Sequence, residues 1–259
     1  MPARYALYYT PARTTLLYSR VSRLFGRTIL SALPFAPEIP EGFSSDEWQA
    51  IVKEPAHYGL HATLKAPFVF REQDLPREQQ EEILCSLCAQ VARRHAPFDT
   101  APLTLARLQS RNGTGSFLAL TPAAEKPSDL SRQKMLALEK DCVLSLESVR
   151  APLSEADVAA RGALDEKEAH YLRTFGYHLV FDRFRFHLTL TGCLSEDRLQ
   201  AVEAALKPLL APMTGKPLRI DSLSLCYQEE RNQPFVEVKR FDLHRAKVLQ
   251  APPLAGIAS

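Results

Sequence analysis

Two short stretches, HATLKAPF (residues 61–68) and HLTLTGCL (residues 187–194), share the frame His, any residue, Thr, Leu. Each stretch alternates polar and apolar residues, which is the pattern of a strand with one buried face. Each is followed by a helical pattern and then by two strand patterns, so the same order of elements occurs twice. This repetition predicts a duplicated fold in which the two stretches hold equivalent places.

The remaining patterns surround these two units. Pro76 and Ser195 begin the helices that follow the two stretches, and the second helix is expected to end near Leu210. From about 127 to 176 the chain reads as a series of helices. The other expected elements are a strand at 5–10, helices at 12–30 and 45–53, a strand pair at 102–110 and 115–122 with its turn at 111–113, and a last strand pair at 217–228 and 234–241.

The charge balance is close to neutral, because 32 Lys and Arg residues face 30 Asp and Glu residues, a formal net charge of +2. Such a balance does not favour binding to a polyanion or to a membrane surface. The N-terminal segment MPARYALYYTP enters a strand pattern with no long apolar stretch. We therefore expect no signal sequence and no membrane span, and a cytoplasmic location is the default.

The five cysteines are scattered, as expected for reduced thiols used as small apolar residues. Cys85 and Cys88 form a C-x-x-C, which can signal a redox pair or half of a zinc site. They lie on the apolar stripe of an expected helix, with Leu84 and Val91, and no second ligand pair stands at metal spacing. We expect these thiols to pack in the core, and we expect no metal and no cofactor.

The polar side chains of each stretch share one face of the expected strand. They are His61, Thr63 and Lys65 in and after the first motif, and Arg183, Arg185, His187, Thr189 and Thr191 around the second. Threonine hydroxyls donate to phosphate oxygens, cations neutralise phosphate charge, and histidine exchanges protons near neutral pH. If the two strands lie side by side, this set could cleave a phosphodiester without a metal ion. One neutral imidazole would take a proton from water while the other, protonated, would give one to the leaving oxygen.

Two other interpretations of the histidines compete with this one. A single histidine on a half-buried strand is usually structural or simply solvated, but the repeated pairing with threonine argues against that here. A zinc site would need more ligands, and neither stretch contains an acidic residue or an H-E-x-x-H. Proton transfer is therefore the favoured interpretation.

On these residues the sequence resembles the two-histidine (2H) phosphoesterase superfamily, whose signature is two H-x-T/S motifs, each followed by an apolar residue. The resemblance extends from about Arg4 to Arg240. The longer stretches HYGLHATLKAPF (57–68) and FRFHLTLTG (184–192), with RYALYYTP (4–11) at the start, are similar to the branch found beside carbon–phosphorus lyase genes and linked to phosphonate metabolism.

The resemblance implies an α+β, bilobal fold in which two pseudo-symmetric lobes place antiparallel sheets on either side of a central cleft, with helices outside. Residues 1–245 would form this single domain, with motif strands near 60–66 and 184–192, and 246–259 would be a flexible tail. Carried over residue by residue, it assigns acid/base catalysis to His61 and His187 and phosphate binding to Thr63 and Thr189. Which histidine is the acid stays open.

Three further residues are candidates for substrate binding from strand parity and expected proximity alone: Lys65, Arg185 and Tyr8. For Tyr58 and Tyr177, aromatic packing is the favoured interpretation. The helical segment at 127–176 departs from the smaller members that the sequence resembles, which run more directly between the lobes. We expect this helical insertion to cover the cleft and narrow the range of substrates.

Three functions stay open at this point. The first is hydrolysis of a small cyclic phosphodiester, in particular a ribose cyclic phosphate from phosphonate breakdown. The second is hydrolysis of a nucleoside 2′,3′-cyclic phosphate or an RNA end, and the third is binding of a phosphorylated metabolite without catalysis. The expected partner is thus a small phosphorylated substrate, with no membrane and with nucleic acid only as a nucleotide or RNA end. The oligomeric state is open.

Overall fold

The computed structural model describes residues 2–110, 115–124 and 126–244. The predicted turn at 111–113 and the predicted tail at 246–259 lie outside these residues. The elements are β1 (Arg4–Tyr9), α1 (Leu16–Phe25), α2 (Ser45–Tyr58), β2 (Ala62–Phe68), α3 (Arg77–Arg94), β3 (Phe98–Gln109), β4 (Ser116–Pro122), α4 (Leu130–Ser145), η1 (Glu147–Val149), α5 (Glu155–Ala159), α6 (Glu166–Phe175), η2 (Phe181–Arg183), β5 (Leu188–Thr189), α7 (Glu196–Leu210), β6 (Pro217–Ile220), β7 (Ser222–Gln228) and β8 (Val236–Asp242).

The strands form two four-stranded sheets with the orders β2-β1-β7-β8 and β5-β4-β3-β6. Every pairing within them is antiparallel, so the predicted α+β class with two antiparallel sheets is confirmed. The two motif strands, β2 and β5, each lie at the edge of a sheet. The strand pair in each sheet comes from the other half of the chain, because β7 and β8 join β2 while β3 and β4 join β5. The two halves are therefore interlocked.

The predicted single strand at 217–228 is divided at Asp221. Its first part, β6, pairs with β3, with Phe98 opposite Ile220, and its second part, β7, pairs with β1 and β8. One continuous segment thus passes from one sheet to the other. This crossing joins the sheet that carries the first motif to the sheet that carries the second.

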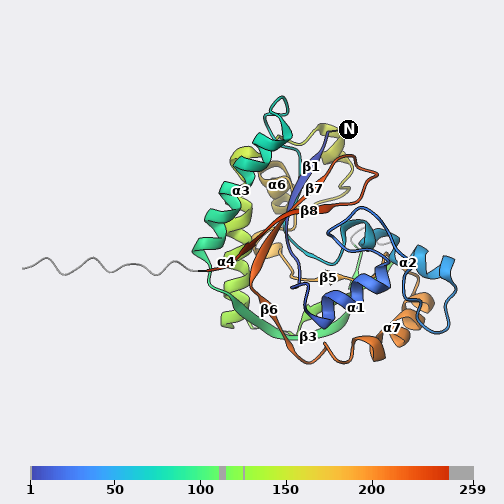
Figure 1. Cartoon of the computed structure of the whole chain (residues 1–259). Helices are drawn as coiled ribbons and strands as arrows, with labels where there is room; N and C mark the ends of the chain where they lie inside the picture. Colours follow the sequence, from blue (N-terminus) through green and yellow to red (C-terminus); the bar gives the residue numbers. More distant parts are fainter. Residues whose placement is uncertain (1, 111–114, 125, 245–259) are drawn as a thin grey trace, which may run out of the picture.

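The apolar core is shared by both sheets. It contains Leu7 and Leu64 from the first sheet and Leu118 and Leu188 from the second in one contiguous cluster of buried side chains. Helices cover this core on two sides: α3 and α4 lie along one side of the molecule, and α1, α2 and α7 lie on the other (Figure 1). The leucines beside the motif threonines, Leu64 after Thr63 and Leu188 before Thr189, therefore pack inward, as strand alternation predicts.

Two helix boundaries near the first motif differ from expectation. The predicted helix at 12–30 is shorter, because Thr15 caps its start and Gly26 ends it with a φ of 65°. The predicted helix at 45–53 is longer and extends to Tyr58 with Pro55 inside it. Gly59 then adopts a φ of 71°, and a Cβ there would lie 2.9 Å from Ile29 Cβ. Glycine at 59 thus permits the tight turn that delivers the chain into the first motif.

The second motif strand is shorter than predicted. The stretch 184–192 forms a strand only at Leu188 and Thr189, which pair with Leu120 and Ala119 of β4. Residues 181–183 before it form a single 3-10 turn in which Phe181 has a φ of 57°. Glu139 of α4 accepts hydrogen bonds from the Phe181 backbone N–H at 3.2 and 3.3 Å. The helical insertion therefore fixes the segment that leads into the second motif.

The C-x-x-C lies in α3, which begins after Pro76 as expected. Cys88 is fully buried in the core and Cys85 is partly buried against it. Within the described part of the chain, no group of three or more His, Cys, Asp or Glu side chains is arranged to hold a metal ion. None of the described helices is long and apolar enough to cross a membrane.

Candidate active site

Both motif histidines are held by the same backbone contact. His61 Nδ1 lies 2.8 Å from the carbonyl oxygen of Gly59, and His187 Nδ1 lies 2.8 Å from the carbonyl oxygen of Arg185. A carbonyl can only accept, so Nδ1 carries the hydrogen in each ring and Nε2 carries the lone pair of the neutral imidazole. No residue that the structure describes forms a hydrogen bond with either Nε2. Both atoms are therefore available to exchange a proton with a ligand.

This backbone contact is not by itself a mark of function. His244, at the end of β8, makes the same contact with the carbonyl oxygen of Asp242 at 2.9 Å. His244 is exposed, whereas His61 and His187 are partly buried, and it has no threonine two positions later. Burial and the following threonine distinguish the two motif histidines.

The two motifs lie close together in space. Burial lowers the pKa of His61 to about 4, and the positive charge of His187 lowers it further, while the hydrogen bond to Gly59 raises it. The ring centroids of Tyr9 and Phe186 are 5.8 Å apart. Tyr9 pairs in register with Ala62 of the first motif, and Phe186 precedes His187 of the second. The fold thus brings together two histidines that are far apart in the sequence.

The second histidine is also less basic than a free imidazole. Burial lowers the pKa of His187, and the hydrogen bond to the Arg185 carbonyl raises it. Removal from water disfavours the charged imidazolium, which is why both rings favour the neutral form when no anion is bound. A bound phosphate anion would oppose this effect.

The motif threonines have unoccupied hydroxyls. Thr63 and Thr189 are partly buried, and neither side chain forms a hydrogen bond with another described residue. Thr191 differs, because its hydroxyl donates to the Gly192 carbonyl oxygen at 2.9 Å and accepts from the Leu118 N–H at 3.0 Å. Thr63 and Thr189 can therefore bind a ligand oxygen, whereas Thr191 is occupied in holding the strand to β4.

Tyr8 forms the surroundings of His61. The two rings have centroids 4.1 Å apart, and Tyr8 is the register partner of Thr63. Its hydroxyl is buried and has no hydrogen-bond partner in the described part of the chain. The ring centroids of Tyr58 and His61 are 5.7 Å apart, and the Tyr58 ring stacks on Phe235. The first motif thus faces an aromatic wall, whereas Thr189 of the second faces the small side chain of Ala119.

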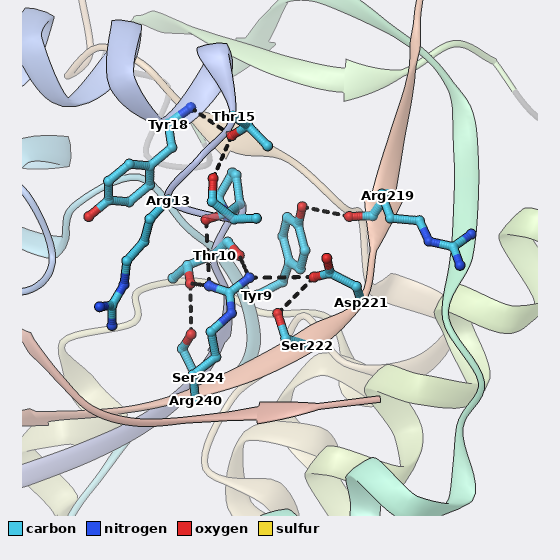
Figure 2. A network of polar contacts seen from close by, with 12 residues as sticks. Tyr9, Thr10, Arg13, Thr15, Tyr18, Arg219, Asp221, Ser222, Ser224 and Arg240 are labelled. Carbon is cyan, nitrogen blue, oxygen red and sulfur yellow. Dashed lines mark hydrogen bonds and ion pairs between the residues drawn. The ribbon is translucent and has the colours of Figure 1, made fainter. Parts of the chain in front are cut away.

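A polar network fixes the end of β1 beside the first motif (Figure 2). Thr10, which follows Tyr9, exchanges a hydrogen bond of 2.7 Å with Ser224, and Arg240 donates to the Thr10 hydroxyl at 2.8 Å and to its carbonyl oxygen at 2.9 Å. Arg240 also contacts Asp221 at 3.4 Å. These contacts hold β1 against β7 and β8, and they anchor the strand on which Tyr8 is presented to His61.

The prediction that Lys65 contacts the substrate is corrected by the register of β2. Thr63 pairs with Tyr8 while Lys65 pairs with Leu7, so Leu64 is an extra residue in a β-bulge. The bulge reverses the side to which Lys65 points. Its side chain is 2% exposed, and its ammonium donates to Glu147 Oε2 at 2.7 Å and to the Phe175 carbonyl oxygen at 3.2 Å. Lys65 is therefore a buried structural residue.

Arg185 lies beside the second histidine. Its carbonyl oxygen holds His187, and Arg185, which is exposed, lines a cavity of about 540 Å³ together with His187. Arg183, which was placed on the same face by parity, instead pairs with Asp165 at 2.6 Å. Of the two arginines before the second motif, only Arg185 is among the residues that line this cavity.

The sequence motifs did not reveal the far wall of this cavity. Arg132 and Met135 of α4 line it together with His187 and Arg185. Both belong to the helical insertion, where neither residue falls in a recognisable motif. The sequence indicated only that the helical insertion would cover the site. It did not indicate which residues of the insertion would do so.

The chain matches the model of one protein family over residues 63–236, and that family is described as Protein of unknown function (DUF1045). Two curated proteins named ribose 1,5-bisphosphate phosphokinase PhnN are similar. The one from Janthinobacterium sp. (strain Marseille) is 30% identical over 243 residues, which are 92% of this chain and 50% of that protein. The one from Laribacter hongkongensis (strain HLHK9) is 31% identical over 195 residues, 74% of this chain and 41% of that protein. The chain thus spans about half the length of the curated relatives it matches.

Among solved structures, the chain is similar to E. coli LigT complexed with 3′-AMP, with 14% identity, a TM-score of 0.39 and coverage of 95% of this chain and 100% of that one. It is also similar to Kluyveromyces marxianus Usb1, with 10% identity, a TM-score of 0.36 and coverage of 91% and 98%. The family model includes Thr63 and the whole second motif. Because that model spans most of the chain, the protein belongs to the family described as Protein of unknown function (DUF1045).

Proposed function

We propose that this protein is a metal-independent cyclic phosphodiesterase of the two-histidine kind, in which His61 and His187 form the acid/base pair. The observation that carries the proposal is the matched state of the two rings. Each is oriented through Nδ1 by a backbone carbonyl, each has an unoccupied Nε2, and the charge of His187 lowers the pKa of His61. Two groups that exchange protons within one site are the requirement for general acid–base cleavage of a phosphodiester.

The pKa values suggest which ring takes which role. His61, with a pKa of about 4, is neutral at physiological pH and can accept a proton at Nε2. It acts as the base: a water oxygen attacks phosphorus, and its proton passes to His61 Nε2. The bond from phosphorus to the ring oxygen breaks, and that oxygen takes the proton from His187 Nε2. One water is consumed, one phosphomonoester and one hydroxyl are formed, and solvent restores both protonation states.

Thr63 and Thr189 bind the phosphate in this proposal. Their hydroxyls lie two residues after the histidines and form no hydrogen bond with a described residue, so they can donate to the two non-bridging oxygens as negative charge builds there. Tyr8 adds a third donor on the side of His61. Burial raises the pKa of the Tyr8 phenol above its ordinary value, so the hydroxyl keeps its proton across the working pH range.

The proposed substrate is a small cyclic phosphodiester, in particular a ribose cyclic phosphate of phosphonate catabolism. Its support is the similarity to two proteins named for an activity on ribose 1,5-bisphosphate, together with a net charge of only +2, which does not favour a long polyanion. A nucleoside 2′,3′-cyclic phosphate or an RNA end would use the same histidines and threonines. Binding of a phosphorylated metabolite without catalysis would use the threonines but not both histidines.

One set of assays separates these functions. The purified protein in EDTA is offered ribose 1,2-cyclic phosphate 5-phosphate and nucleoside 2′,3′-cyclic phosphates, and phosphomonoester formation is followed. The proposal expects turnover of the ribose compound in EDTA. It also expects His61→Ala and His187→Ala each to lower kcat by about 10²–10⁴-fold. His244→Ala is the matched control, since it removes a histidine with the same backbone contact, and it should keep full activity. Tight binding of a substrate with no turnover of any of them would show that the proposed phosphodiesterase activity is wrong.

A further inference from the structure

The cavity beside His187 has two walls from distant parts of the chain. One wall is the segment 184–187 that leads into the second motif, and the other is the start of α4, with Arg132, Met135 and Leu136. Leu108 of β3 and Thr121 of β4 also line it. In register, Leu108 lies opposite Phe117 and Thr121 lies two residues beyond Ala119, the partner of Thr189. The cavity therefore adjoins the face of the sheet that carries Thr189 and His187.

Two arginines face this cavity and have no partner in the described part of the chain. Neither Arg132 nor Arg185 makes a side-chain hydrogen bond or an ion pair with another described residue. Their neighbours are different: Arg183 pairs with Asp165, and Arg107 pairs with Glu196 and Glu203. Asp129, the residue before α4, accepts a hydrogen bond from the Lys126 N–H and not from Arg132. Two arginines therefore line one cavity without an anionic partner among the described residues.

A second, smaller cavity shows how arginines behave when the fold itself uses them. It measures about 60 Å³, and four of its lining residues are arginines: Arg4, Arg150, Arg161 and Arg231. Arg4 donates to Gln228, Arg150 pairs with Glu147, and Arg231 pairs with Asp157. Three of these four arginines are already occupied by polar partners, the guanidinium of Arg161 lies 5.7 Å from the centroid of the Tyr177 ring, and the space is small. The large cavity differs on both counts, since its two arginines are unoccupied and its volume exceeds that of a single phosphate.

We propose that the large cavity binds a second anionic group of the substrate, a phosphomonoester at the far end from the reacting phosphodiester, through Arg132 and Arg185. This inference rests on the proposed function, because it takes the reacting phosphate to lie between His61, His187 and the two threonines. A phosphomonoester carries two negative charges near neutral pH, and each guanidinium offers paired N–H donors that match its oxygens. The apolar lining, from Met135, Leu136 and Leu108, would contact the carbon skeleton between the two phosphates.

The arrangement gives a direction to the substrate. The aromatic wall of Tyr8 and Tyr58 closes the site beside His61, where the Tyr8 side chain is fully buried. The large cavity is lined by His187, and His61 is not among its lining residues. The part of the substrate that leaves phosphorus when His187 protonates its oxygen would therefore extend toward Arg132 and Arg185.

The test compares pairs of substrates that differ in one phosphate. Ribose 1,2-cyclic phosphate is used with and without a 5-phosphate, and adenosine 2′,3′-cyclic phosphate with and without a 5′-phosphate. The protein should prefer the phosphorylated member of at least one pair. Arg132→Ala and Arg185→Ala should each reduce that preference, measured as a ratio of kcat/KM values, by about 10- to 100-fold, which is the effect of losing a charged hydrogen bond. The Arg185 carbonyl that holds His187 is retained in its variant.

Arg173→Ala is the matched control, because Arg173 is an exposed arginine on α6 that forms no ion pair with a described residue and lies outside the cavity. It should leave the ratio unchanged. Equal losses on both members of a pair, or no loss in either variant, would overturn the second-anion site while leaving the phosphodiesterase in place.

A binding measurement tests the second-anion site independently of the proposed catalytic activity. Calorimetry with ribose 5-phosphate is carried out on the wild type and on Arg132→Ala and Arg185→Ala. If no cyclic substrate is hydrolysed but ribose 5-phosphate binds about 10-fold more weakly to both variants, the anion site stands and the proposed catalysis fails. If binding is the same in all three proteins, the anion site is wrong whatever the catalytic result.

Discussion

Lys65 Nζ lies 2.7 Å from Glu147 Oε2, and only 2% of the Lys65 side chain is exposed. This ion pair joins β2, the strand of the first motif, to η1 in the helical insertion. Glu139 of the same insertion holds the Phe181 N–H just before the second motif. The insertion therefore supports both motif strands from behind, while its first turn lines the cavity beside His187.

Loss of Glu147 should destabilise the protein more than loss of Lys65. Glu147→Gln leaves the buried ammonium of Lys65 without its counter-charge, which costs about 3 kcal/mol of unfolding free energy. Lys65→Met removes the buried charge, and Glu147 keeps its ion pair with Arg150, so the loss should be smaller. Urea unfolding of both variants measures the difference. If Lys65→Met instead has wild-type stability and a KM raised about 10-fold, which is a binding loss of about 1.4 kcal/mol, then Lys65 contacts the substrate.

Glu139 should make stability depend on pH. Burial raises its pKa to about 8, from an ordinary value of 4.5. The folded state then keeps a proton that the unfolded state loses, so this group's stabilisation is full below about pH 4.5, falls as pH rises toward 8 and is lost above it. Glu139→Gln keeps an acceptor for Phe181 and removes the titration. Its unfolding free energy should exceed that of the wild type at pH 9 by an amount on the order of 2–5 kcal/mol, measured by urea unfolding. If the difference in unfolding free energy between Glu139→Gln and the wild type is the same at pH 5 and at pH 9, this prediction is wrong.

The Tyr8 hydroxyl should matter for catalysis but not for folding. It is buried without a partner in the described residues, so Tyr8→Phe removes an unsatisfied polar group and should leave stability equal or higher by about 1 kcal/mol. If the hydroxyl donates to the phosphate, kcat/KM should fall by about 10-fold. Tyr5→Phe is the control, because the Tyr5 hydroxyl is also buried without a partner but its ring packs on Phe68 and Phe70. Equal kinetics in the two variants would limit Tyr8 to packing against His61.

The three threonines near the motifs should separate into two classes. Thr63→Val and Thr189→Val remove an unoccupied hydroxyl and should lower kcat by about 10²-fold at little cost in stability. Thr191→Val leaves the buried Leu118 N–H without its acceptor, so it should lower the unfolding free energy by about 1–3 kcal/mol. Thr189→Ser should recover most of the activity. Thermal unfolding and steady-state kinetics on the same four proteins test this, and a stable, fully active Thr189→Val protein would exclude the phosphate-binding role.

The sequence was informative where local patterns decide the structure. The alternation in each motif correctly placed Leu64 and Leu188 in the core, because burial of one face is a local constraint on a strand. It failed at Lys65, since a bulge is set by pairing with β1 and not by the residues of β2 alone. It also missed Arg132, because only the tertiary fold brings α4 to the second motif. The division of 217–228 between two sheets likewise depends on partners that are distant in the sequence.

The acid and base roles should be visible in the pH dependence of kcat/KM, which reports the free enzyme. Catalysis needs His61 neutral and His187 protonated. Burial lowers the pKa of His61 to about 4 and lowers that of His187 below its ordinary 6.5. The value of kcat/KM should therefore rise as pH rises through about 4 and fall as pH rises through the pKa of His187, with its maximum below 6.5. Because the two rings interact, the limbs belong to the pair.

Measurement of kcat under saturation should move the alkaline limb upward, since the bound phosphate anion favours the imidazolium of His187. The residual activity of His61→Ala should lose the acidic limb and keep the alkaline one, whereas His187→Ala should do the reverse. If the two variants lose the opposite limbs, His187 is the base and His61 is the acid. In that case the leaving oxygen lies beside Tyr8, and the far end of the substrate no longer points toward Arg132.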